Sequence, residues 1–461
     1  PPPILSGLVG SEMCIRDRII GGEEIKSDNL SEMHVPHDHQ HVLGNYHKAG
    51  LKEVNMAIEA SLEAWKTWSK TSIEDRAQIF LKAADLLAGP WRDTVNAATM
   101  LNMSKNVYQA EIDAACELID FFRFNAWYAQ ELTKHQPMYS PEGMKNSLEL
   151  RPLEGFIFAV SPFNFASIGG NLPCAPAMMG NVALWKPASS AVYPAYFIMQ
   201  LLIEAGLPRG VINFIPGSGR DVGPNVMSNS NLAGVHFTGS TNVFQGMWKS
   251  VGENIANYKS YPRIVGETGG KDFCIAHESA NIDALATAMV RGAFEYQGQK
   301  CSAMSRAYIP TTIWSSLKSK YIAQVDNIKM GDPEDFSNFM NAVIDKSAFD
   351  SISKFIDFAN DSEDAQILTG GKYDEEKGYF IDPTTILTSD PKFRTMCEEI
   401  FGPVLTIFLY DPSKWDETLK LVDSTSQYAL TGCVMAEDKI ALKEAKDALT
   451  HSAGNFYIND K

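Results

Sequence analysis

The sequence predicts an α/β protein built on a parallel sheet, because three features occur together. Short, continuously apolar segments rich in Val, Ile and Phe recur at 155–163, 181–187, 210–217 and 232–239. Segments with helical periodicity lie between them, and one of these ends at Gly206. The chain is also long enough, at 461 residues, for two or three domains with sizeable cores. Buried strands that alternate with helices form βαβ units, and such sheets bind ligands at the carboxyl ends of their strands.

Helices precede this alternation, and a second α/β domain follows it. Residues 51–135 place apolar side chains three and four positions apart, which is typical of amphipathic helices. Residues 136–152 are polar and rich in Pro, Gly, Ser and Asn, so they predict a hairpin or a linker. After residue 273 the alternation resumes with a helix and four apolar, strand-like segments. The chain stops after a further apolar segment, and we expect it to lack a C-terminal part.

Composition and charge narrow the class of function. With 45% hydrophobic and 21% charged residues, the composition is that of an ordinary globular protein. A formal net charge of −16 argues against nucleic acid or an anionic membrane as the main partner, and no apolar run is long enough to predict a membrane span. The seven cysteines form no CxxC pair, which favours a reducing compartment over a disulfide framework.

The N-terminal region offers little that points to function. Residues 1–18 carry neither a transit-peptide nor a signal-peptide pattern, and we predict a foreign or disordered leader there. Five histidines follow between residues 34 and 47. They would suit either a metal site or a solvated loop. Because their spacing fits no ligand motif, we expect a loop and no metal.

Three polar motifs directly follow predicted strands, and each allows two interpretations. Asn164 in SPFNF is either a turn residue or an amide donor that points into the crevice at the strand ends. Lys186 in WKPAS is either the solvent edge of its strand or a contact to a nucleotide. Gly239 and Ser240 in FTGST precede a helix, whose N-terminus can bind phosphate. This last motif is weak alone, and the GxGxxG fingerprint does not occur.

Three further segments contain residues that could carry chemistry. Glu267 in GETGGK lies in a glycine-rich stretch and could hang into a cleft as a general base. Cys301 in GQKCSA is either an inert buried thiol or a nucleophile. Glu399, which stands with Phe401 in EEIFGPV, is either part of a solvated face or a ligand contact.

Taken in this order along the chain, these residues resemble the aldehyde dehydrogenase superfamily. The most specific part of the resemblance is GETGGK followed by GQKCSA and EEIFGPV, and the similarity extends over most of the chain. Segments such as RPLEGFIFAVSPFNF, PRIVGETGGKDF and AFEYQGQKCSA are closely similar to the proline-catabolic branch, whose members oxidise L-glutamate γ-semialdehyde. Phe244 supports this branch, because many other members of the superfamily have glycine at its position.

The resemblance implies a catalytic mechanism and a cofactor. Cys301 would be the nucleophile, Asn164 would stabilise the oxyanion and Glu267 would activate the hydrolytic water. The residues implied in cofactor binding are Lys186, Ser189, Gly239, Ser240, Glu399 and Phe401. Ser189 replaces a glutamate that would repel a 2′-phosphate, so we expect NAD with some tolerance of NADP. The residues implied in substrate binding are Lys300, Ser302 and Phe165, although a lysine such as Lys300 also suits a solvent-facing position.

The resemblance also implies a fold and its domains. We expect an aldehyde dehydrogenase-like fold with a Rossmann-type NAD-binding domain over 19–138 and 154–268. A small β oligomerisation flap is expected at 139–153. The α/β catalytic domain is expected over 269–461, without its C-terminal part. The expected partners are a small-molecule semialdehyde and further copies of the chain, as a homodimer or higher homo-oligomer, with no nucleic acid and no membrane.

The activity implied is NAD-dependent oxidation of L-glutamate γ-semialdehyde to L-glutamate through a cysteine thiohemiacetal and a thioester. Two alternatives stay open. The first is a dehydrogenase of another semialdehyde, such as succinate semialdehyde, and the second is a truncated, inactive relative that binds only nucleotide. We expect a bacterial cytoplasmic protein, or one of the mitochondrial matrix if the source is eukaryotic and a transit peptide has been lost.

Overall fold

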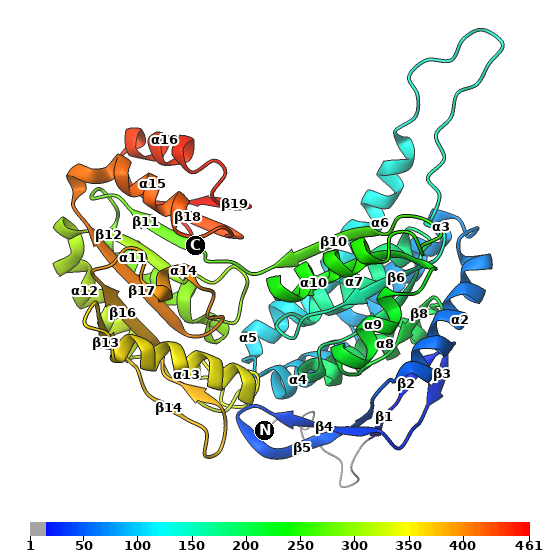
Figure 1. Cartoon of the computed structure of the whole chain (residues 1–461), viewed down its shortest axis with the longest axis horizontal. Coiled ribbons are helices and arrows are strands. Elements are labelled where there is room, and N and C mark those ends of the chain that lie inside the picture. Colours follow the sequence, from blue (N-terminus) through cyan, green and yellow to red (C-terminus); the bar gives the residue numbers. More distant parts are fainter. Residues whose placement is uncertain (1–14) are drawn as a thin grey trace. The chain divides into compact units, whose positions relative to one another are not determined.

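The structure is a computed structural model that describes residues 15–461, and the chain divides into two compact units (Figure 1). Unit 1 comprises residues 15–35, 41–103 and 107–268. Unit 2 comprises residues 36–40, 104–106 and 269–461. Across the part of the chain that the structure describes, we find no helix with both the length and the hydropathy to span a membrane.

Unit 1 contains a parallel-rich sheet and the helices that cover it. Its strands are β1 (Ile15–Arg16), β2 (Arg18–Ile20), β3 (Glu23–Ile25), β4 (Leu30–Val35), β5 (Asp38–His47), β6 (Phe156–Val160), β7 (Val182–Lys186), β8 (Ile212–Phe214), β9 (Leu232–Gly239) and β10 (Arg263–Thr268), of which β5 begins in unit 2. Its helices are α2 (Leu51–Trp68), α3 (Ile73–Ala88), α4 (Arg92–Met103), α5 (Val107–Ala110), the π-helix η1 (Glu111–Glu117), α6 (Leu118–Lys134), α7 (Ala166–Met178), the 3₁₀-helix η2 (Ser189–Ala191), α8 (Val192–Ala205), α9 (Gly219–Met227) and α10 (Thr241–Glu253).

The main sheet of unit 1 has the strand order β10-β9-β6-β7-β8-β2-β3. The first five of these strands run parallel, and β2 and β3 extend the sheet in antiparallel pairing. The strands expected from the apolar segments are therefore present as β6, β7, β8 and β9. Helices are also present in the region expected over 51–135, but the segment Glu111–Glu117 is the π-helix η1 rather than an α-helix.

One sequence-based expectation about unit 1 was wrong, and a second was wrong for the last residues of its range. The histidine-rich segment is not a solvated loop, because most of it lies in β4 and β5, and His37 and His47 are buried. The leader expected over 1–18 lies outside the described residues up to 14, but its last residues belong to the fold. Arg18 is fully buried, donates to the carbonyls of Ile25 and Lys48, and lies 3.4 Å from Glu53. A buried arginine with these bonds is part of the folded unit.

The flap expected at 139–153 contains no strand, although all of its residues are described. The chain between α6 and β6 runs outward from the helices and returns (Figure 1). The side-chain amide of Gln136 bonds both the N–H and the carbonyl of Leu148, at 2.9 and 3.1 Å, in place of a backbone ladder. The apolar side chains of this ribbon, such as Tyr139 and Met144, are exposed, so no buried apolar face stabilises two paired strands. Its role in oligomerisation stays a prediction.

Unit 2 is also built on a sheet covered by helices. Its strands are β11 (Phe273–Ala276), β12 (Arg306–Pro310), β13 (Ala365–Thr369), β14 (Tyr373–Asp374), β15 (Phe380–Ile381), β16 (Thr384–Thr388), β17 (Val404–Tyr410), β18 (Thr431–Met435) and β19 (Asn455–Ile458). Its helices are α11 (Ile282–Phe294), η3 (Glu295–Gly298), α12 (Thr311–Asp326), α13 (Lys346–Asn360), α14 (Arg394–Cys397), η4 (Pro412–Lys414), α15 (Trp415–Thr425) and α16 (Lys439–Ala448). The sheet order is β13-β16-β17-β12-β11-β18-β19, and only β13 pairs antiparallel.

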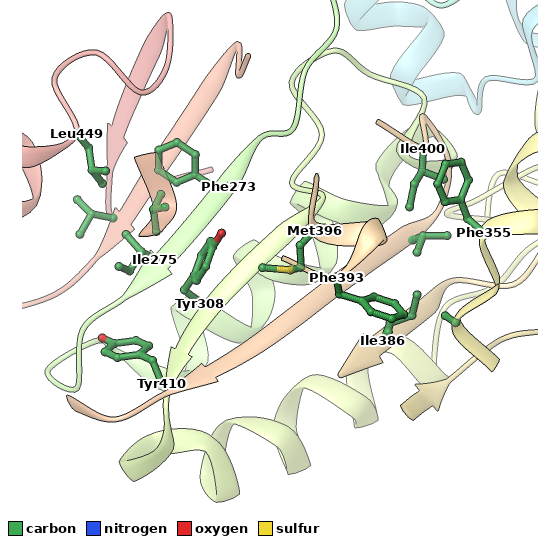
Figure 2. Close-up of a cluster of buried hydrophobic side chains, with 14 of the residues drawn as sticks. Phe273, Ile275, Tyr308, Phe355, Ile386, Phe393, Met396, Ile400, Tyr410 and Leu449 are labelled. Carbon is green, nitrogen blue, oxygen red and sulfur yellow. The ribbon is translucent and has the colours of Figure 1, made fainter. Parts of the chain in front are cut away.

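A cluster of buried apolar side chains holds the sheet of unit 2 to its helices (Figure 2). The strands contribute residues such as Phe273, Tyr308 and Ile386, while α13 and α14 contribute Phe355 and Met396. Each buried side chain of this size stabilises the folded unit by roughly 1.5–3 kcal/mol relative to exposure. The cluster therefore fixes β12 and β17, the strands that follow the segments with Cys301 and Glu399.

Lys271 carries a buried amine beside this core. Its side chain is 1% exposed, and no acceptor within residues 15–461 lies within hydrogen-bonding distance of its Nζ. Burial and, to a smaller extent, the charge of Arg306 lower the pKa of Lys271 to about 7, although the carboxylate of Glu399 offsets part of both effects. In the folded protein at neutral pH, a large share of the Lys271 amines is therefore uncharged.

Replacing Arg18 with alanine should destabilise unit 1, because the change removes the donor of two partly buried carbonyls and the cation beside Glu53. We expect a loss of about 3 kcal/mol in the free energy of unfolding, measured by urea denaturation. The matched control is Arg209→Ala, since Arg209 pairs with Glu23 on the surface of the same unit and should matter little. Equal effects of the two changes would contradict a structural role for residue 18.

Replacing Lys271 with methionine should change how stability depends on pH. Between pH 7 and 10 the unfolded chain keeps Lys271 protonated while the folded chain does not, so the unfolded state binds more protons and stability from this group rises with pH. The advantage of Lys271→Met over the wild type in urea midpoint should therefore be largest near pH 6–7 and shrink towards pH 10. With the exposed Lys318→Met as control, a pH-independent difference for both variants would contradict this account.

Candidate active site

In unit 1, the sheet brings the predicted residues of four strands to one edge. Strands β10, β9, β6 and β7 are consecutive neighbours and all run parallel. In their register Glu267 pairs with Thr238, one residue before Gly239, and Val160 pairs with Lys186. Because the carboxyl ends of parallel strands share one edge of a sheet, Glu267, Gly239 and Lys186 lie along that edge, and the loop with Asn164 leaves from it.

Asn164 and Phe165 occupy the loop between β6 and α7. Asn164 is 3% exposed, and Phe165 is the half-buried N-cap residue of α7. The loop starts at Ser161, whose hydroxyl accepts a hydrogen bond from the indole of Trp185 at 2.9 Å. A buried amide next to a helix N-terminus is a suitable donor for an oxygen that becomes negative during a reaction.

Lys186 ends β7 as a buried cation. Its Nζ donates to the carbonyl of Pro187 at 3.1 Å, and burial lowers the pKa of Lys186 to about 8. Because Lys186 is buried, the interpretation as the solvent edge of its strand is wrong. A buried amine costs free energy unless it is hydrogen-bonded or paired with a ligand. Ser189, three residues on, is exposed and begins η2.

Gly239 and Ser240 join β9 to α10. Ser240 is the exposed N-cap of this 13-residue helix, whose N-terminus carries unsatisfied N–H groups and a partial positive charge. A Cβ at Gly239 would lie 2.7 Å from the ring of Phe237, and that ring stacks on Phe244 at 5.4 Å. The space that the two aromatic rings occupy thus explains why residue 239 is glycine, whether or not a phosphate binds there.

Glu267 lies in a strand and not, as expected, in a glycine-rich loop. It is half-buried near the end of β10, and the two glycines that follow belong to unit 2. Because β10 is the edge strand of its sheet, one side of the strand has no neighbour within the sheet. A strand holds the carboxylate of Glu267 in a better-defined position than a glycine loop would.

In unit 2, Cys301 follows a strained segment. Tyr296 and Gln297 both have positive φ angles, of 53° and 55°, which L side chains rarely adopt. The side-chain amide of Gln297 fixes this conformation, because it donates to the carbonyls of Ser104 and Ala342 and accepts from the N–H of Asn341. Strained backbone that its surroundings hold in place is typical of functional sites, and it points here to the segment that carries Cys301.

The segments with Cys301 and Glu399 lie against each other in unit 2. A Cβ at Gly298, whose φ is +65°, would lie 2.2 Å from the carbonyl oxygen of Gly402, so only glycine permits this approach. Phe401, beside Gly402, also has a positive φ, of 56°. Partial enclosure raises the pKa of the solvent-accessible Glu399, although the nearby Lys271 offsets part of this shift. The structure therefore brings Cys301, Glu399 and Phe401 into one region.

Lys300, which precedes Cys301, belongs to a charged cluster. Its Nζ lies 2.8 Å from Glu295, which also contacts Arg291 at 2.8 Å and Lys461 at 3.9 Å. Burial works to raise the pKa of Glu295, but Lys300, Lys461 and Arg291 together lower it below its ordinary value. Three cations around one carboxylate leave a net positive charge in the neighbourhood of Cys301 and the half-buried Ser302. The solvent-facing interpretation of Lys300 is therefore wrong.

The predicted site residues thus form two groups, one in each unit. Unit 1 holds Asn164, Phe165, Lys186, Ser189, Gly239, Ser240 and Glu267, and unit 2 holds Lys300, Cys301, Ser302, Glu399 and Phe401. Sequence analysis missed Gln297 and Glu295. Both stand within EYQGQKC, the segment that already drew attention to Cys301. The partners of Gln297 lie far away in the chain, as does Lys461, whereas the other two partners of Glu295 are local.

Comparisons with known proteins show what this chain is similar to. The family described as "Aldehyde dehydrogenase family" matches residues 25–461. The chain is 50% identical to delta-1-pyrroline-5-carboxylate dehydrogenase, mitochondrial, of Dictyostelium discoideum, over 100% of this chain and 85% of that protein. It is 48% identical to the protein of the same name from Homo sapiens, over 96% of this chain and 79% of that protein.

A solved structure is similar over the same extent. The delta-pyrroline-5-carboxylate dehydrogenase of Mycobacterium tuberculosis, bound with NAD, superimposes with a TM-score of 0.95 at 46% identity, over 99% of this chain and 84% of that one. These similarities confirm the predicted fold class and the predicted resemblance. The chain belongs to the aldehyde dehydrogenase family.

Proposed function

We propose that this chain is an NAD-dependent dehydrogenase that oxidises L-glutamate γ-semialdehyde, formed from Δ1-pyrroline-5-carboxylate, to L-glutamate in the second step of proline degradation. The observation that carries the proposal is sequence similarity. Over nearly its whole length the chain is about 50% identical to proteins named delta-1-pyrroline-5-carboxylate dehydrogenase. The strained segment before Cys301 supports it independently, because it marks the nucleophile that the reaction needs.

The chemistry proceeds through Cys301. Its thiolate adds to the aldehyde carbon, and the carbonyl oxygen becomes the oxyanion of a thiohemiacetal. The side-chain amide of Asn164 and the N–H of Cys301 donate to that oxygen, and one such donor typically contributes about 3–4 kcal/mol to the transition state. Bound NAD supplies the hydride acceptor. Loss of hydride leaves a thioester, and Glu267 takes a proton from the water that hydrolyses it to the acid and the free thiol.

The residues of both groups fit NAD. The buried amine of Lys186 offers a hydrogen-bond donor for ribose hydroxyls at the carboxyl edge of the sheet. The N-terminus of α10, with Gly239 and the exposed Ser240, suits a pyrophosphate. In unit 2, the carboxylate of Glu399 suits the hydroxyls of the second ribose, with Phe401 beside it. The exposed Ser189 carries no charge against a 2′-phosphate, so NADP is tolerated.

The substrate brings an α-carboxylate, which needs positive charge at some distance from the aldehyde. The cluster of Lys300 with Arg291 and Lys461 around Glu295 supplies a net positive charge beside Cys301. Lys300 and Ser302 bind the carboxylate, and Phe165 covers the aliphatic stem. For Lys300 this requires the substrate to compete with Glu295, which favours a substrate that is itself an anion.

Assembly and location complete the proposal. Unit 1 binds the cofactor and unit 2 carries the nucleophile, and the exposed ribbon at 139–153 serves assembly into a homodimer or higher homo-oligomer. The protein works in the bacterial cytoplasm or, from a eukaryotic source, in the mitochondrial matrix. The names of eukaryotic relatives, which include the word mitochondrial, support the second location for such a source.

Replacing Cys301 with alanine should abolish NAD reduction with pyrroline-5-carboxylate. We expect the rate of NADH formation to fall by about 10³-fold or more, because the change removes the atom that bonds to the substrate. Cys397→Ala is the matched control, since Cys397 is another half-buried cysteine of unit 2 and its loss should leave the rate near that of the wild type. Activity that survives in Cys301→Ala would refute the assignment.

The same assay separates the proposed substrate from its main rival. The ratio of kcat/KM values should favour glutamate γ-semialdehyde over succinate semialdehyde, because only the first carries both an amine and a carboxylate at its far end. A strict preference for succinate semialdehyde would move the chain to another activity within the family.

A further inference from the structure

A buried carboxylate of unit 1 holds the start of α7, directly after Asn164. Asp113, on the π-helix η1, is 1% exposed. Its Oδ2 accepts the N–H of Ala166 and its Oδ1 accepts the N–H of Ser167, both at 2.9 Å. These are two of the N–H groups that have no partner within their own helix. Asp113 therefore binds the two residues that follow the Asn164–Phe165 pair.

The helix cannot satisfy these groups from its own sequence. Its N-cap residue is Phe165, whose ring has no oxygen that could accept a hydrogen bond, whereas Ser, Thr, Asp and Asn are the usual N-cap residues. A carboxylate from η1 takes over this role and also meets the positive end of the α7 dipole. The bonds join segments more than fifty residues apart in the sequence, so they set where the loop before α7 lies.

A second carboxylate on the same π-helix reinforces this contact. Glu117, four residues after Asp113 and thus on the same side of the helix, accepts the hydroxyl of Ser167 at 2.8 Å. A π-helix rarely extends over seven residues and frequently marks a functional site. The unusual helix thus directs two acids at the first turn of α7, at the end where Asn164 enters.

We propose that Asp113 is a positioning residue for Asn164. By clamping the N–H groups of Ala166 and Ser167, it fixes the backbone that carries Asn164, so that the amide of Asn164 points at the substrate oxygen without reorganising. This rests on the proposed function, in which Asn164 stabilises the oxyanion. Asp113 itself is buried among protein groups and acts only through the loop.

The test is a double-mutant cycle in the full chain, with NAD and pyrroline-5-carboxylate as substrates. Asp113→Asn turns one accepting oxygen into an NH₂ that faces a backbone N–H, and it should lower kcat by at least about 10-fold with KM changed less than about 3-fold. In an Asn164→Ala background, the same change should lower kcat by less than about 3-fold, because the group that it positions is already gone.

The matched control is Glu111→Gln. Glu111 is a carboxylate of the same π-helix, but it bonds Arg92 and Asn96 instead of α7. Its loss should leave kcat within about twofold of the wild type, even where thermal stability falls. Hydrogen exchange of the amides at 166 and 167 should accelerate in Asp113→Asn and not in Glu111→Gln, which checks the clamp without any activity measurement.

The outcomes separate the two proposals. If Asp113→Asn lowers kcat by the same factor in the wild-type chain and in the Asn164→Ala background, the positioning role is overturned, since the effect would then be one of general stability. If Asp113→Asn fails to fold, Asp113→Ser, which places no NH₂ against a backbone N–H, enters the same cycle. If the wild type oxidises propanal but not pyrroline-5-carboxylate, the substrate assignment fails and the cycle is run with propanal. A wild type that oxidises no aldehyde overturns both.

Discussion

The parallel pairing of β6, β7, β9 and β10 is the constraint on which the candidate site of unit 1 depends. Each strand is short, and its chemical residue lies at or just beyond its carboxyl end. Because the four strands point the same way, a lysine, a glycine–serine turn, a glutamate and the Asn164 loop all reach one edge. Apolar side chains along the strands pack the sheet, and this leaves the strand ends available for polar groups.

Unit 2 positions its candidate residues in a different way, since Cys301 lies in a segment without regular strand or helix. There the backbone adopts left-handed conformations and is fixed by contacts with distant parts of the chain. Gln297 bonds three backbone groups, and Gly298 presses against Gly402 near Glu399. The energetic cost of each strained residue, roughly 1–3 kcal/mol, is offset by these bonds and by the buried apolar cluster of unit 2 (Figure 2).

Sequence analysis found what depends on local pattern. The central strands of unit 1 are continuous apolar runs, and the residues after them could be picked out in advance. It missed β10, because an edge strand with Glu267 and an exposed Val265 shows no apolar run. It also missed η1, because a π-helix has nearly the apolar spacing of an α-helix. The roles of Asp113 and Gln297 depend on partners some 50 to 200 residues away, which no local pattern encodes.

The central claim is that the substrate is oxidised while bound covalently to Cys301 and then released by a water that Glu267 activates. Rapid mixing of Glu267→Gln with pyrroline-5-carboxylate and NAD, followed by acid quenching and peptide mass analysis, tests this directly. The account predicts a burst of about one NADH per chain, then turnover at least about 10-fold slower, with a glutamyl adduct on the peptide that contains Cys301. No burst, or an adduct on another residue, would contradict it.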